Sequence, residues 1–301
     1  MTHITHPSFS EYEAGFVRAE QPLRQGDVLE FLAAEEFPNG WERVLGLVVT
    51  GNCDLALGKH WGTITYVPAL PIDNYVQQFA IPKILTREAS QAESNILNYF
   101  PAEQARQACK RAAEMMNLGY AIEDIEVLLR DPQGRKEEFR KDLSILQLYQ
   151  STASLLEESR GGAIFWSTID LFNEKYDQVM RLSRGKSKKE KMRTEIRNYL
   201  KRLPGDSLYL CNPSPEHHEA YVATLRLVRG IEDQAVALRS VDELHYPTQY
   251  RARRVARLGV LYCNQMVQQM AGVFTDIGLP ADYERTRDSY VENYIENWRI
   301  E

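Results

Sequence analysis

At 301 residues, the chain is long enough to bury a substantial core in one or two domains. Hydrophobic residues make up 44% and charged residues 26%, as is ordinary for a soluble globular protein. The net charge of −6 argues against a protein that coats nucleic acid over its whole surface, because such proteins are basic, but it leaves room for a local basic patch.

Cysteine spacing and hydropathy predict a cytoplasmic protein. The N-terminus lacks the basic and apolar regions of a signal peptide, and no apolar stretch reaches the roughly 20 residues of a membrane span. The sequence therefore predicts no metal site, no cofactor and no membrane partner. Four widely spaced cysteines without metal-site spacing are expected to be free thiols: Cys53, Cys109, Cys211 and Cys263.

The N-terminal third is predicted to be β structure. A strand is expected over 28–32, and a long apolar run indicates a buried second strand over 41–50. Residues 62–70 alternate as a third strand does, and Pro68 and Pro71 are expected to end that strand or mark an edge. Three short strands without intervening helices indicate a small antiparallel barrel.

Helical periodicity dominates residues 83–203. Apolar side chains recur at helical spacing in four long segments, as Leu143, Leu146 and Leu155 illustrate in one of them. Proline, glycine and turn sequences separate these segments, as expected where helices stop. We predict a block of five to six helices.

β structure is expected to return after residue 204. One short strand is predicted at 206–215, and two more follow at 220–230 and 234–241. A long helix is then predicted over 249–277, where the apolar residues fall near one face and a Gly-Leu-Pro sequence stops it. The tail to Glu301 could form a final short helix.

These elements are most economically assembled as an α+β fold, in which a small SH3-like antiparallel barrel is split by a helical insertion. The barrel would use residues 1–82 and 204–301, with the insertion at 83–203 and a long C-terminal helix. Three strands alone would leave unpaired edges and too small a core, which favours this assembly. Three separate domains are the alternative.

Part of the N-terminal region carries a family resemblance. Gly-Asp-Val at 26–28, Arg43 before an apolar strand that ends at Thr50, and Tyr-Val-Pro at 66–68 resemble the start of the MazF/PemK-like (CcdB-related) barrel endoribonuclease toxins. Arg43 matches the family's basic residue before the second strand, and Thr50 matches its hydroxyl residue. The resemblance implies a PemK-like barrel and RNA cleavage. A Cys-Asp pair after such a strand is also similar to uncharacterised bacterial defence-associated proteins.

RNA cleavage of this kind needs a base for the 2′-hydroxyl proton and a cation at the phosphate. The guanidinium of Arg43 suits the phosphate geometry, and His60 or the carboxylate of Asp54 could be the base. The structural alternative makes Arg43 a solvated residue at a strand end and Thr50 a capping hydroxyl.

The same turn permits a second chemistry. Cys53 could be a thiol nucleophile paired with His60, with backbone amides of the Gly-Asn turn at 51–52 as oxyanion donors. A metal site is a further reading, but Gly-Asn is also ordinary turn chemistry, and a lone cysteine is usually a small buried hydrophobe. Similarly, His217 and His218 could meet a neighbouring glutamate at a metal, although a solvated turn suits adjacent histidines better.

Two basic clusters stand out in an otherwise acidic chain. Residues 181–202 hold ten lysines or arginines against two glutamates, and a second group is expected to begin the last long helix. Such patches suit a phosphate backbone or an acidic partner surface. The candidate binding residues are Arg184, Lys186, Lys188, Lys189, Lys191, Arg193, Arg197, Arg251, Arg253, Arg254 and Arg257.

The sequence leaves two functions open. No phosphate loop, dinucleotide-binding motif, zincin motif or nucleophile elbow is found. The first hypothesis is a barrel protein that recognises nucleic acid, RNA above all, as an endoribonuclease-like effector of a bacterial toxin or anti-phage defence system. The second is a non-catalytic interaction subunit that binds the protein product of a neighbouring gene in a bacterial defence complex.

Overall fold

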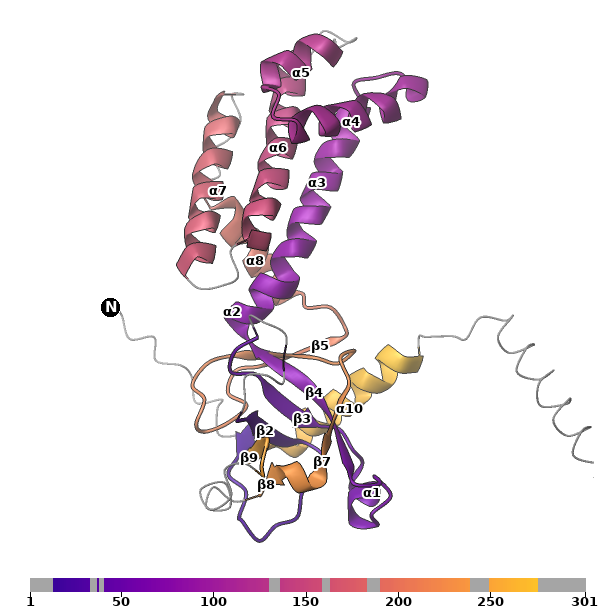
Figure 1. The fold of residues 1–301 in the computed structure, drawn as a ribbon, viewed down its shortest axis with the longest axis vertical. Helices are drawn as coiled ribbons and strands as arrows, with labels where there is room; N and C mark the ends of the chain where they lie inside the picture. Colours follow the sequence, from indigo (N-terminus) through magenta and orange to yellow (C-terminus); the bar gives the residue numbers. More distant parts are fainter. Residues whose placement is uncertain are drawn as a thin grey trace, which may run out of the picture.

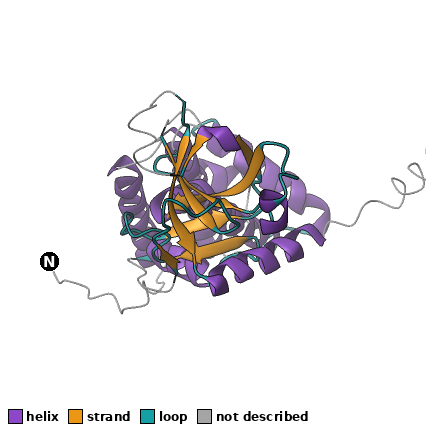
Figure 2. Cartoon of the chain, turned by 90° about the horizontal axis from the view of Figure 1, so that it is seen from below, coloured by secondary structure: helices purple, strands orange, loops and turns teal. Residues whose placement is uncertain are grey.

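The computed structural model describes residues 13–32, 37, 41–129, 136–158, 163–182, 190–238 and 249–275. These residues form a mainly antiparallel sheet that curls into a half-barrel, with a large helical insertion projecting from one end (Figure 1). Seen from below, the strands curve around a common centre, and helices lie outside them (Figure 2). The predicted α+β fold with a split, barrel-like sheet is therefore confirmed.

Both β segments of the chain contribute to this one sheet. The strand order is β1-β9-β2-β3-β4-β6-β5, with β7 also paired to β4 and β8 to β9. All pairs are antiparallel except β8 with β9. The strands are β1 (Ala14–Gly15), β2 (Asp27–Phe31), β3 (Leu45–Val48), β4 (Thr63–Pro71), β5 (Ser207–Leu210), β6 (Tyr221–Thr224), β7 (Arg229–Glu232), β8 (Val236–Ala237) and β9 (Ala252–Leu258).

The long strand β4 organises the middle of the sheet. It continues through Pro68 to Pro71, so Pro68 does not end the strand as expected. Strand β3 pairs with residues 66–69 along one edge of β4. The single strand predicted at 220–230 is instead split into β6 and β7, which pair with different halves of β4. The break falls opposite Pro68, which has no N–H to donate, and the Thr224 hydroxyl donates to the Pro68 carbonyl at 3.2 Å.

The prediction of one helix over 249–277 is wrong. Residues 252–258 form β9, which pairs with β2 in the sheet, and the helix α10 (Val260–Thr275) begins only after Gly259. Val255 and Leu258 lie three positions apart and so fit a helix face in sequence. The unpaired edge of β2 supplies the hydrogen-bond partner that makes this segment a strand. Residues 276–301 and 239–248, with the rest of their predicted elements, lie outside the described part.

Alternating side chains give the sheet two apolar faces. On one face, Val28, Leu47 and Val67 pack with Met266 of α10. On the other face, Leu29 and Tyr66 belong to a cluster that reaches the helical insertion. The sheet is therefore held between α10 and the base of the insertion.

The helical insertion begins at the end of β4, earlier than residue 83. Pro82 cannot donate a helical hydrogen bond, and the turn before it is a π-helix, η3 (Val76–Ala80). Among the described residues the α-helices of the insertion are α2 (Ile72–Tyr75), α3 (Ile81–Leu97), α4 (Ala102–Asn117), α5 (Ile122–Leu129), α6 (Lys136–Glu158), α7 (Ala163–Leu182) and α8 (Lys191–Lys201).

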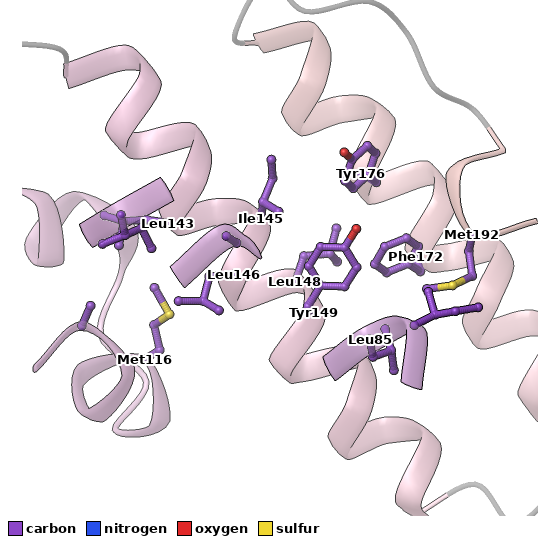
Figure 3. Close-up of a cluster of buried hydrophobic side chains, with 14 of the residues drawn as sticks. Leu85, Met116, Leu143, Ile145, Leu146, Leu148, Tyr149, Phe172, Tyr176 and Met192 are labelled. Atoms are coloured by element: carbon purple, nitrogen blue, oxygen red, sulfur yellow. The ribbon is translucent and has the colours of Figure 1, made fainter. Parts of the chain in front are cut away.

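The insertion has its own apolar core. Tyr149 of α6 lies beside Phe172 of α7 and near Leu85 of α3, whereas Leu143 and Leu146 of α6 lie toward Met116 of α4 (Figure 3). The last helix, α8, returns to the base of the insertion, where Tyr199 and Leu200 pack against both this core and the sheet. Helix α8 is thus one structural link between the two parts of the fold, and α2 and η3 are another.

Candidate functional site

Thr50 closes the turn after β3. Its hydroxyl accepts the Thr65 N–H at 2.6 Å and lies 3.4 Å from the Thr65 carbonyl, so it joins β3 to β4. The next residues form the short helix α1 (Asn52–Ala56). Thr50 therefore makes the structural hydrogen bond expected of a capping hydroxyl. Cys53 and Asp54 lie close by on α1.

His60 is held by two acceptors. Its Nδ1 lies 3.2 Å from the Asp54 carbonyl oxygen, and its Nε2 lies 3.1 Å from a carboxylate oxygen of Asp233. Both bonds can form together only when the ring carries two protons. Consistently, the hydrogen bond to Asp233 and then that to Asp54 raise the pKa of His60. While both bonds are made, neither ring nitrogen has a free lone pair, so His60 could act as a base only after one of these bonds is released.

The thiol of Cys53 is exposed, and its nearest polar contact is the Asp54 carboxylate at 3.7 Å. Since both ring nitrogens of His60 are engaged elsewhere, the ring does not activate this thiol. Asp233, the partner of His60, was not predicted from the sequence. It comes from the end of β7, 173 positions away, and no local pattern indicates the contact.

Arg43 lies at the opposite end of β3 from Thr50. Seven residues of extended chain at about 3.3 Å each separate the two by roughly 20 Å. Its guanidinium pairs with Glu219 at 2.6 Å, and Glu219 in turn accepts the Tyr221 hydroxyl at 3.1 Å. The structure thus brings Thr50, Asp54 and His60 together and leaves Arg43 apart from them.

A polar network fixes the β5–β6 loop to the sheet. His217 lies 3.1 Å from Glu30, and Arg253 binds Glu30 at 2.6 Å and Glu216 at 3.0 Å. The hydrogen bond from His217, followed by the bonds and charge of Arg253, lowers the pKa of Glu30 although burial opposes the shift. His218 is exposed. No His, Cys, Asp and Glu group among the described residues could hold a metal ion.

The second basic cluster is largely turned inward on β9. The Arg254 side chain is only 1% exposed, and burial lowers its pKa. Arg254 and Arg257 both face the fully buried carboxylate of Asp27. Arg251 is exposed just before β9, whereas Arg253 belongs to the network around Glu30. This cluster therefore holds β9 and β2 together rather than forming an open basic surface.

Part of the first basic cluster, on α8, is exposed to solvent. Lys191 is half-buried and pairs with Glu88 and Glu195, and Arg193 pairs with Asp170 at 2.7 Å. Arg197 is exposed and makes no ion pair or hydrogen bond within the part of the chain that the structure describes. The other four predicted residues, Arg184, Lys186, Lys188 and Lys189, lie outside that part.

A groove of about 610 Å³ follows this exposed face. Arg193, Ile196, Arg197, Leu200 and Lys201 of α8 line it, together with Tyr209 of β5. Lys201 continues the spacing of 193 and 197 and could have been singled out on that basis. Tyr209 could not, because it reaches the groove from a strand that follows α8 in sequence.

Comparison with known proteins gives no match to any protein-family model, curated protein or solved structure. The resemblance to barrel endoribonuclease toxins therefore stays a prediction. Among the described helices, none has the length and apolar character needed to cross a membrane. The groove on α8, with an exposed tyrosine and cations that are unpaired within the described residues, is the candidate functional site.

Proposed function

We propose that this chain binds single-stranded nucleic acid, with RNA as the expected ligand, in the groove between α8 and β5. The observation that carries the proposal is a row of three cations, Arg193, Arg197 and Lys201, beside the exposed ring of Tyr209. Proteins that bind single strands combine a basic groove for the backbone with aromatic side chains for the bases.

The row of cations follows one face of α8. Residues four positions apart share a helix face and lie about 6 Å apart along the axis, so the row is about 12 Å long. Arg197 and Lys201 have no ion pair or hydrogen bond within the described part of the chain, so their charges are available to a ligand. This length suits a short run of backbone phosphates.

Tyr209 supplies a stacking contact that a single strand can make and that other anions cannot. Tyr209 is 38% exposed, and Ile196 and Leu200 give the groove an apolar floor. Bases stack on aromatic rings with about 1–3 kcal/mol each, and this contact needs an unpaired base. An acidic protein segment would use the cations but would gain no stacking.

An acidic hollow limits the groove at one end. Asp170, Glu174 and Asp177 line this neighbouring hollow of about 490 Å³, which shares Arg193 with the groove. Carboxylates repel phosphates, so the strand is expected to run from Arg193 toward Lys201 and away from α7.

Cleavage is not part of this proposal. Arg43 pairs with Glu219 and lies far from the loop that holds Thr50 and Asp54. His60 is bound to two acceptors, which suits a cation rather than a base. Endoribonuclease activity and a role in bacterial defence remain predictions of the resemblance alone.

The test is fluorescence anisotropy with a labelled 12-nucleotide RNA, the DNA strand of the same sequence, and the RNA duplex. The two cations that are unpaired in the described part, Arg197 and Lys201, predict a slope of log K against log salt near −1.4, since each phosphate contact contributes about −0.7 for a single strand. Affinity should then fall about 7-fold between 50 and 200 mM salt. Arg197→Ala should reduce the slope to about −0.7.

Two further variants separate stacking from charge. Tyr209→Ala should weaken binding at least 5-fold without changing the salt slope, whereas Tyr209→Phe should bind nearly as the parent does. Arg106→Ala on α4 is the matched control, because Arg106 is also exposed, helical and without a partner in the described part. Equal binding of the duplex, or an Arg197→Ala variant indistinguishable from Arg106→Ala, would refute the proposal.

A further inference from the structure

Trp61 has the largest exposed fraction, 93%, of the large hydrophobic side chains among the described residues. It lies in the loop between α1 and β4, where Leu57 is also 66% exposed. In Figure 1 this loop, beside the label α1, projects from the end of the sheet that faces away from the helical insertion. An exposed tryptophan on a projecting loop offers the kind of aromatic anchor that is enriched in protein interfaces.

The loop holds Trp61 outward in a strained conformation. Trp61 has φ of 53°, in the left-handed region that favours glycine, and it stands between Gly58 and Gly62 with φ of 65° and 74°. A side chain other than glycine's is disfavoured there by roughly 1–2 kcal/mol. Such strain persists only where the surrounding structure fixes it, and it clusters at functional sites.

Hydrogen bonds make this loop rigid. The Gly62 carbonyl accepts the Asp233 N–H at 2.9 Å, and the His60 carbonyl accepts the Thr63 N–H at 2.9 Å. The ring of His60 joins the loop to Asp233 and to Asp54 of α1. A pre-organised loop loses little conformational entropy when it binds, which increases the affinity available from its contacts.

The surrounding charge selects the kind of partner. Asp54, Glu232 and Asp233 lie at the base of the loop, where Lys59 and His60 are the only basic residues of the segment 52–63. With the ring of His60 protonated, as its two acceptors favour, the five groups still sum to −1. This balance gives no attraction for phosphate backbones or anionic lipid surfaces.

We infer that this loop, residues 57–62, docks into a partner protein that offers an apolar pocket with basic residues at its rim, and that Trp61 is the anchor. A buried tryptophan contributes about 150–250 Å² of contact, and tryptophan is one of the residue types enriched among interface hot spots. The loop and α8 lie at opposite ends of the sheet in Figure 1, so the surface is separate from the proposed nucleic-acid groove.

The test uses the full chain in the organism that encodes it. Replacement of Trp61 by the photoreactive amino acid p-benzoylphenylalanine is expected to crosslink one protein on illumination. The same replacement of Phe16, which is 78% exposed at a different place, should not crosslink it. The crosslinked protein is then purified, and its affinity for the parent chain, Trp61→Ala and Phe16→Ala is measured by calorimetry.

Trp61→Ala should weaken this binding about 30-fold or more, as removal of a hot spot does, while Phe16→Ala leaves it unchanged. Both variants should keep the parent's melting temperature, because neither side chain belongs to an apolar core cluster. Crosslinks from position 61 to nucleic acid, to lipid or to a second copy of the chain would overturn the inference. So would the absence of a crosslink, or an undiminished affinity of Trp61→Ala.

Discussion

Replacing Asp27 by asparagine tests the way in which β9 is joined to β2. The Asp27 side chain is fully buried and accepts the Arg24 N–H at 2.8 Å. Arg257 binds it with two nitrogens, at 2.5 and 3.0 Å, and Arg254 lies 3.5 Å away with 1% of its side chain exposed. Asp27→Asn removes the only carboxylate in this group and leaves the two guanidiniums facing each other.

The expected loss of folding stability in Asp27→Asn follows from the burial of the ion pair. Removing one partner of a buried ion pair is destabilising by about 3–5 kcal/mol, because the remaining charge has lost its compensation. At about 2 °C per kcal/mol for a chain of this size, the melting temperature should fall by roughly 6–10 °C. Asp206→Asn is the matched control, since Asp206 pairs with the half-exposed Arg226 at 2.7 Å. Exposed pairs contribute about 0–1 kcal/mol.

Differential scanning calorimetry of the three proteins measures the effect directly. Urea denaturation should give the same order of stability with an unchanged m-value, because the surface exposed on unfolding is the same. If Asp27→Asn melts within 2 °C of Asp206→Asn, then Arg254 is not buried against Asp27, and the reasoning about β9 fails.

Two further outcomes concern titratable groups. The hydrogen bond to Asp233 raises the pKa of His60, so the attraction between the two is complete below about pH 6.5 and is lost as the pH rises through the raised pKa. Asp233→Asn should bring the pKa of His60 back toward 6.5 in an NMR titration. An unchanged pKa would contradict the contact. Burial raises the pKa of Cys109 to about 11, so at pH 8 only about one molecule in a thousand carries this thiolate. Iodoacetamide should therefore label exposed Cys53 long before Cys109 in a peptide map, and similar rates would disprove the burial.

Much of the fold could be predicted from local patterns. A continuous apolar run predicted β3, alternation of side chains predicted β4, and helical periodicity predicted the insertion, because each pattern reflects which faces of an element are buried. The argument that three strands leave open edges predicted that the C-terminal segment completes the sheet. Residues 252–258 were predicted to be helical because Val255 and Leu258 fit a helix face, and their place in the sheet depends on pairing with the distant strand β2.

Some residues of the candidate sites could be predicted from the sequence, and others depend on how distant elements pack. The row Arg193, Arg197 and Lys201 is visible in the sequence, because spacing of four places side chains on one face of any helix. Tyr209 completes the groove from another element, and its role depends on how β5 packs against α8. Likewise, the solvent-facing charges expected in the second cluster depend on whether β9 lies in the sheet.

The sequence by itself determined the periodic features of this protein: two strand-rich segments, the helical block between them, and the basic face of α8. Only the tertiary structure decided which charges are cancelled and which remain open. Arg43 meets Glu219 across 176 positions, and His60 meets Asp233 across 173. Contacts of this kind leave no periodic trace in a sequence, because they are fixed by the packing of whole elements rather than by the spacing of neighbouring residues.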